Sequence, residues 1–264
     1  MRRLRSFQSL PATFIATIVI VGVFVGMCVG ACVGACLDAG AVSPARPGRT
    51  LPDTLAQRVA ACTGCHGREG RAAPDGFHPR IAGKPSGYLY QQLLNFRDGR
   101  RRHVAMAHLL ANLDDAYLAE IADYFATQEV PYPAPRPAAT SAATMARGRS
   151  LVSDGDASRE IPPCAACHGE RFTGVAPAVP GLLGLPRDYL NAQLGGWKNG
   201  LRKARAPDCM AAIASRLSPQ DIEAVSAWLS SQPVPAGGKA VTALTTKPPV
   251  ECGSIVPGAP SMSP

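Results

Sequence analysis

Apolar residues recur along much of this chain at intervals of three and four positions, the spacing that lines one face of an α-helix. Helices are expected over six stretches: 53–61, 88–97, 114–128, 143–152, 189–198 and 218–231. The last is expected to begin at Ser218, because serine caps a helix N-terminus and Pro219 suits the first helical position. No stretch alternates between apolar and polar residues for long, so the pattern predicts an all-α fold.

The expected helices form two copies of one pattern. With Pro79 placed on Pro180, the two segments align without a gap as far as Gly99 and Gly200, and three extra residues then enter the second copy. Matching positions include Gly83 and Gly184, Tyr88 and Tyr189, Gln92 and Gln193, Phe96 and Trp197, Met106 and Met210, and Leu113 and Leu217. This internal repeat predicts two tandem domains of the same fold.

The segments outside the repeat complete the expected domain organisation. The two domains are expected at 52–130 and 142–233. The proline-rich stretch 131–141 between them cannot continue a helix and is typical of a semi-rigid linker. The tail, residues 234–264, has no helical period and is expected to be irregular.

The N-terminal segment 1–41 has the character of an export signal or membrane anchor. Three arginines in its first five residues precede the apolar stretch 12–37, which is expected to form a hydrophobic helix. The stretch either is cleaved off after Ala41 or stays as an anchor, since about 20 apolar residues span a bilayer. Residues 33–36 also resemble a lipoprotein cleavage site. Each alternative places the residues from 42 onward in the periplasm, either soluble or anchored in the cytoplasmic membrane.

Composition narrows the classes of protein to be considered. The hydrophobic fraction of 46% can bury a core and excludes a chain that is disordered throughout. Only 6% of the residues are aromatic, so the core lacks bulky side chains. Lysine and arginine number 27 against 19 aspartates and glutamates, a formal net charge of +8 that favours an acidic partner or an anionic surface.

Two groups of basic residues, here called the basic clusters, occupy matching stretches of the repeat. Their members are Arg100, Arg101 and Arg102 in the first copy, and Lys198, Arg202, Lys203 and Arg205 in the second. They form either an ordinary solvated face or a docking surface for a redox protein with an acidic face, which long-range attraction would steer. A protein partner is expected, and no nucleic acid.

Two copies of one cysteine motif supply the candidate chemistry. They are Cys62-Thr63-Gly64-Cys65-His66 and Cys164-Ala165-Ala166-Cys167-His168. Cys-x-x-Cys-His is typical of covalent haem c attachment: both thiols add to haem vinyl groups, and the histidine becomes the proximal iron ligand. The alternatives are a redox dithiol, which does not require the histidine, and half of a zinc site, for which no second ligand pair follows. Two covalently bound haem c groups are therefore expected, and they would fill a core that is short of aromatic side chains.

The sixth ligand of each iron decides between electron transfer and catalysis. The first copy offers Met106, His78, His103 and His108, but only Met106 recurs in the second copy, as Met210. The expected ligand pairs are therefore His66 with Met106 and His168 with Met210. His/Met ligation raises the reduction potential and closes the coordination sphere, which suits electron transfer.

A proline follows each motif at nearly the same distance. Pro79 and Pro180 lie 13 and 12 residues beyond the proximal histidines. A proline carbonyl there can accept the histidine Nδ1–H and orient the ring. A plain turn proline explains the pattern equally well.

Together these features resemble the dihaem class I cytochromes c, specifically the cytochrome c4 type, over about residues 53–232. The resemblance rests on the paired Cys-x-x-Cys-His-Gly motifs, on the stretch 79–83 before a recurring tyrosine and glutamine, and on the recurring methionine. It implies a periplasmic electron carrier whose two domains face each other about a pseudo-twofold axis, with haem propionates near the interface. It also implies that Gly148 lets the C-terminal helix cross closely. The loop before Met210 and the tail depart from the family pattern.

Two classes of function are consistent with these motifs. The first is an electron carrier, not an enzyme, that passes electrons from a quinol-oxidising complex or a periplasmic dehydrogenase towards a terminal oxidase. A haem subunit tethered to an oxidase or dehydrogenase differs from such a carrier only in its partner. The second is a dihaem peroxidase, which needs one iron with a vacant or displaceable ligand. Methionine in both copies favours the carrier.

Cys209 and Cys252 lie outside both motifs and outside the N-terminal segment. An exported compartment is oxidising, so we expect these two cysteines to form a disulfide. The bridge would pin the tail over the loop that carries Met210. The alternative is that one or both remain free thiols.

Overall fold

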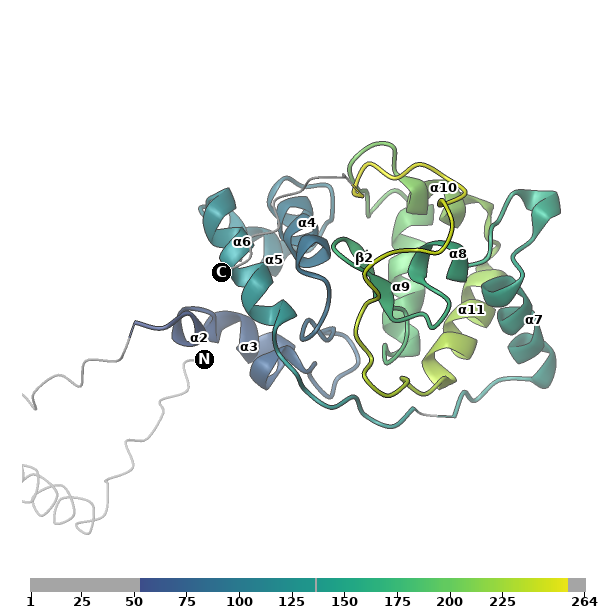
Figure 1. Cartoon of the computed structure of the whole chain (residues 1–264), viewed down its shortest axis with the longest axis horizontal. Helices are drawn as coiled ribbons and strands as arrows, with labels where there is room; N and C mark the ends of the chain where they lie inside the picture. Colours follow the sequence, from purple (N-terminus) through teal and green to yellow (C-terminus); the bar gives the residue numbers. More distant parts are fainter. Residues whose placement is uncertain (1–52, 136, 256–264) are drawn as a thin grey trace, which may run out of the picture. The chain divides into compact units, whose positions relative to one another are not determined.

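The computed structural model describes residues 53–135 and 137–255 (Figure 1). Within these ranges the chain is mainly helical, with one short sheet of two strands. The expected hydrophobic helix at 12–37, the three N-terminal processing alternatives and the end of the tail at 256–264 lie outside the described residues. No helix within the described ranges is long and apolar enough to cross a membrane. From Asp53 onward the described residues belong to one compact unit, in which we call 53–130 the first half and 142–233 the second half.

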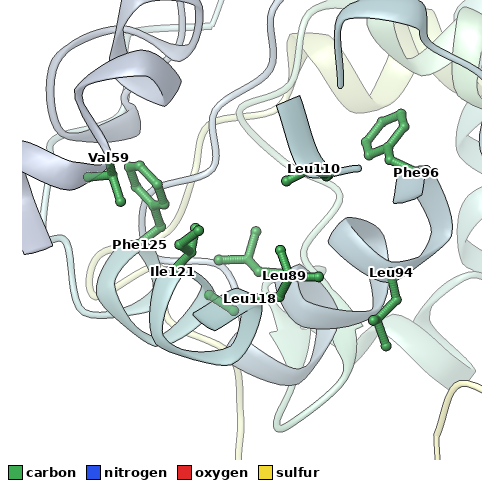
Figure 2. Packing of buried hydrophobic residues seen from close by; sticks show 9 residues of the cluster. Val59, Leu89, Leu94, Phe96, Leu110, Leu118, Ile121 and Phe125 are labelled. Carbon is green, nitrogen blue, oxygen red and sulfur yellow. The ribbon is translucent and has the colours of Figure 1, made fainter. Parts of the chain in front are cut away.

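The first half consists of short helices around one apolar cluster. In chain order they are α2 (Leu55–Arg58), α3 (Ala60–His66), the 3-10 turn η1 (Arg68–Gly70), α4 (Ser86–Arg97), α5 (Val104–Leu110) and α6 (Asp115–Ala126). Helices α4 and α6 pack against each other. Figure 2 shows the buried side chains of the cluster, which are mostly aliphatic, with Phe96 and Phe125 as its aromatic members.

Helix α6 shows how the local sequence produces this packing. Asp114 caps its N-terminus, because the carboxylate accepts a hydrogen bond from Tyr117 N at 2.8 Å. The buried residues of the helix, Leu118, Ile121, Ala122 and Phe125, follow the three- and four-residue spacing of one helical face. The helix predicted over 114–128 is therefore confirmed, with one face turned into the core.

The second half repeats this arrangement with additions. Its elements are α7 (Ala142–Ser153), the 3-10 turn η2 (Ala157–Arg159), α8 (Ala165–His168), β1 (Gly174–Val175), β2 (Val179–Pro180), α9 (Arg187–Lys198), α10 (Cys209–Arg216) and α11 (Pro219–Ser231). Ser218 caps helix α11 as predicted, and Asp221 completes a capping box with it. Helices α7 and α11 approach so closely that a side chain at Gly148 would collide with Ala224 O. The glycine therefore permits the close crossing that the family resemblance implies.

The short sheet is a difference from the predicted all-α fold. Strand β1 pairs antiparallel with β2, and Gly174 lies opposite Pro180. Strands of two residues are too short to produce an alternating pattern, so periodicity could not reveal them. The loop between them reaches the first half, where Tyr88 N donates a hydrogen bond to Pro177 O at 3.2 Å.

The two halves also meet through equivalent backbone segments. Arg101 and Arg202, which occupy the same position of the repeat, form an antiparallel bridge. Beside it, Lys203 N donates to Arg100 O at 2.7 Å, and Arg102 N donates to Leu201 O at 3.3 Å. Antiparallel pairing of equivalent residues is the local geometry that a twofold axis produces.

Residues 234–255 of the tail contain no helix but contact the second half at several points; Figure 1 draws this segment in yellow. Val241 N donates to Gly174 O at 3.0 Å, and Ala176 N donates to Val241 O at 2.8 Å, so the tail lies beside β1. Farther along, Cys252 is linked to Cys209 by a disulfide with a Cα–Cα distance of 5.1 Å.

Candidate haem-binding sites

The first motif occupies helix α3 and ends at its last residue. Cys62 is half-buried and Cys65 exposed, and both are free thiols. His66 is buried, and its Nδ1 donates a hydrogen bond to Pro79 O at 2.9 Å. With Nδ1 carrying the proton, Nε2 keeps its lone pair for a metal. Burial lowers the pKa of His66, which favours the same neutral imidazole.

The second motif has the same geometry. Cys164 and Cys167 are free, half-buried thiols, and His168 is buried at the end of α8. Its Nδ1 donates to Pro180 O at 2.8 Å. Burial raises the pKa of Cys164 to about 12, and it also raises the pKa of Cys167. A redox dithiol needs a lowered thiol pKa, so this environment does not favour that alternative.

Both candidate methionines lie near the start of a short helix that a side chain caps. Met106 is half-buried on α5 and packs against the first apolar cluster. Its N–H donates to His103 Nδ1 at 3.3 Å, so His103 serves as the N-cap of α5. Met210 is half-buried on α10, where Asp208 accepts from Ala211 N at 3.0 Å.

The other histidines proposed as sixth ligands have different surroundings. His78 contacts Asp75 through Nδ1 at 2.6 Å. His108 is exposed on α5, and His103 has its Nδ1 engaged in the helix cap. His103 therefore has its acceptor nitrogen occupied, whereas His78 keeps Nε2 free, so the preference for Met106 rests on its recurrence in the second half as Met210.

A hydrogen-bonded network at the meeting of the two halves was not foreseen. Arg101 donates to Gln92 Oε1 at 3.1 Å, to Gln193 Oε1 at 2.6 Å and to Tyr189 Oη at 3.2 Å. Arg202 donates to the same two glutamines, at 2.7 Å for Gln193 and 2.9 Å for Gln92. Each glutamine thus accepts hydrogen bonds from the arginine of its own half and from the equivalent arginine of the other half. The internal repeat had already aligned Gln92 with Gln193.

The positive charge of this network has no carboxylate partner among the described residues. Arg202 is 6% exposed, and burial lowers its pKa to about 10, with Arg101 acting in the same direction. The Arg202 guanidinium stacks on the Trp197 ring at 3.7 Å, and the buried Trp197 Nε1–H has no acceptor within the described chain. Two guanidiniums and an unpaired N–H form a donor set that fits carboxylate groups, such as haem propionates.

The structure corrects the interpretation of the basic clusters as surface groups. Arg202 is buried, and Arg101 is half-buried in the network, because their guanidiniums meet across the two halves. Arg100 pairs with Asp98 at 2.8 Å. The exposed members are Arg102, Lys198, Lys203 and Arg205.

Lys84, like Arg80, is a buried cation that the sequence analysis missed. It is 7% exposed and belongs to the first half, yet its Nζ donates to Gly181 O of the second half at 3.5 Å. One feature of the sequence could have drawn attention to it. The equivalent position of the second copy is the apolar residue Leu185, so a lysine is out of place at this position of the repeat.

Comparison with known proteins places these sites in a family context. The cytochrome c family profile matches residues 145–233. The chain is 36% identical over 176 residues to the thiosulfate dehydrogenase electron acceptor of Thiomonas intermedia, covering 67% of this chain and 80% of the relative. It is 34% identical over 174 residues to cytochrome c4 of Pseudomonas aeruginosa, covering 65% and 84%. The crystal structure of reduced cytochrome c4 from Pseudomonas stutzeri superposes with a TM-score of 0.58 at 29% identity, over 67% of this chain and 95% of that one.

Proposed function

This chain belongs to the cytochrome c4 family of dihaem class I cytochromes c, and we propose that it accepts electrons from a periplasmic dehydrogenase. As a member of this family it binds two covalent haem c groups and carries electrons between redox partners; it is not an enzyme. The observation that supports a dehydrogenase as donor is the 36% identity to a thiosulfate dehydrogenase electron acceptor, 80% of which is covered. A quinol-oxidising complex is the alternative donor, and a terminal oxidase is the proposed acceptor.

In the first half we assign covalent attachment to Cys62 and Cys65, and the proximal iron position to His66 Nε2. Pro79 O supports this role because it fixes the proton on Nδ1 and holds the ring in one orientation. Met106 is assigned as the distal ligand, on a helix whose start is held by a side-chain cap. The bound iron would carry one electron by alternating between its ferric and ferrous states.

In the second half the same roles fall to Cys164 and Cys167, to His168 with Pro180 O, and to Met210. The hydrogen bond from His168 Nδ1 to Pro180 O orients the ring as its counterpart does. With a histidine and a methionine both bound, each iron would have no open position for substrate, in keeping with a carrier and against a peroxidase.

Between the halves, we assign Arg101, Arg202 and the Trp197 Nε1–H to the haem propionates. Their buried positive charge and unpaired donor support this assignment, since carboxylates would neutralise the guanidiniums and accept the free N–H. The first half has Phe96 in place of Trp197, with Arg101 stacked on it at 4.4 Å. The two propionate environments would therefore differ by one hydrogen-bond donor.

The proposal also covers the localisation of the protein and the boundaries of its domains. We propose that 1–41 directs export or anchors the chain, through the apolar stretch 12–37, and that 52–130 and 142–233 are separate cytochrome c domains joined by 131–141. The separate apolar clusters of the two halves support two domains. The basic sequence start and the apolar stretch support export.

Electron transfer from the donor is expected to depend on salt and on the exposed members of the basic clusters. With thiosulfate dehydrogenase reduced by thiosulfate as the donor, stopped-flow haem reduction should slow about tenfold between about 10 and 200 mM ionic strength, because salt screens long-range attraction to an acidic face. A triple variant, R102Q/K203Q/R205Q, should be slower at low salt and less salt-dependent.

The matched control for this experiment is K247Q, which removes an exposed lysine outside both clusters. It should behave as the wild type. Arg101 and Arg202 are left unchanged because they are buried or half-buried within the network. A rate independent of salt would remove the docking hypothesis, and a failure of this donor to reduce the protein would favour the quinol-oxidising complex.

The Cys209–Cys252 disulfide is expected in the purified protein. Protease digestion without reductant should yield the linked peptides, and recovery of both cysteines alkylated without reductant would contradict the bridge. The cysteines are separated by 43 residues, for which loop closure stabilises the fold by about 3–4 kcal/mol. C252S should therefore unfold at lower temperature, and the near-infrared methionine–iron band should weaken for the second haem and not for the first.

A further inference from the structure

Lys84 is, with Arg80, one of two buried cations for which the assignments above provide no role. It precedes α4 in the first half, but its Nζ lies 3.5 Å from Gly181 O in the second half. Gly181 directly follows Pro180, whose carbonyl accepts the Nδ1–H of His168 at 2.8 Å. The lysine of one half therefore reaches the backbone that orients the proximal histidine of the other half.

The ammonium of Lys84 keeps its charge at neutral pH without a counter-ion in the described structure. Burial lowers the pKa of Lys84 to about 8, with the positive charge of Arg80 as the second cause, so the protonated form still predominates at pH 7. No carboxylate lies within ion-pair distance of Lys84 or Arg80 among residues 53–135 and 137–255. Because it is removed from water, this charge is screened less than a surface charge would be.

The field of Lys84 extends to the second proximal ligand. The pKa of His168 is lowered chiefly by burial, and the charge of Lys84 also lowers it. The equivalent position in the second half is Leu185, an apolar residue that is 7% exposed. The proximal side of the first haem therefore receives no such lysine from the second half.

We propose that Lys84, contributed by the first half, raises the reduction potential of the haem attached to the second half. This inference rests on the proposed attachment of haem c at Cys164, Cys167 and His168. A fixed positive charge opposes the extra positive charge of ferric iron and so favours the ferrous state. Lys84 is a positioning residue in this role, since it acts through space and through the Pro180 segment without touching the iron.

The consequence is a bias in how electrons distribute between the two haems. Exchange between them moves one electron from one iron to the other, and no proton or other group is transferred. Lys84 would hold that electron on the second haem, so that the first haem acts as the entry and the second as the reservoir or exit. This bias arises from one position of the repeat, which is Lys84 in the first copy and Leu185 in the second.

The test is a redox titration of the full-length dihaem protein with Lys84 replaced by glutamine, methionine or arginine. K84Q and K84M should lower the potential of the second haem and shift the electron distribution by about tenfold towards the first, the order expected for one unit charge acting over roughly 10 Å. K84R keeps the charge and should change little. The redox wave of the second haem is identified as the one that M210H displaces.

K247Q is the matched control, because Lys247 is an exposed lysine outside both basic clusters. It should leave both potentials unchanged. Equal shifts of both haems, or the same shift in K84R as in K84Q, would overturn the role of the Lys84 charge. Failure of the proposed function is distinguished at the outset, since a protein with fewer than two covalent haems per chain contradicts the attachment sites whatever Lys84 does.

Discussion

A variant with alanine at both Cys164 and Cys167 is expected to mature with one covalently bound haem c per chain instead of two. Both thioether bonds of the second half would be lost, and the remaining contact from His168 cannot hold the group covalently. Intact-protein mass and the haem-to-protein ratio after acid extraction measure the outcome. The second half should also unfold more easily, because its apolar cluster would lose the large planar group that is expected to complete its core.

The control removes the same number of cysteines elsewhere in the chain. C209A/C252A breaks the tail disulfide but should retain two covalent haems, since neither residue belongs to a motif. The reciprocal variant, C62A/C65A, should retain only the haem of the second half. Two haems surviving in C164A/C167A would refute the attachment site there.

The second large effect is expected from exchanging the distal methionines for histidine. M106H and M210H should each keep both covalent haems but lower the potential of one haem by at least about 0.1 V, within the about 0.8 V range that axial ligands span. The reason is that imidazole is the stronger donor to ferric iron. Each variant should also lose about half of the near-infrared methionine–iron band.

Met145 supplies the comparison for these variants, because it is a half-buried methionine on α7 with no assigned role at iron. M145L should leave both potentials and the near-infrared band unchanged. Absence of that band in the wild type would overturn the assignment for both methionines. If one of the two histidine variants kept the full intensity of the band, the methionine replaced in it would not be an iron ligand, and that haem would need another distal ligand.

Several properties of this protein follow from local sequence. The helix at α6 is specified by apolar spacing and by the cap at Asp114, and the start of α11 is specified by Ser218 and Pro219. The haem motif is equally local, since its thiols and histidine lie within five consecutive residues. Interactions between residues close in sequence determine the helix boundaries and the haem motif. The sequence was therefore enough to predict these features and the family to which the chain belongs.

Other properties depend on what a second, distant segment supplies. The charge of Arg202 suggested a surface group, but Gln92 and Arg101 of the other half enclose it. Lys84 likewise finds its hydrogen-bond acceptor, Gly181 O, in the segment after Pro180 of the other half. Burial and hydrogen-bond partners are set by residues about a hundred positions away, and no local pattern carries that information. The repeat could identify equivalent positions, whereas only the packing of the halves determined which of them face each other.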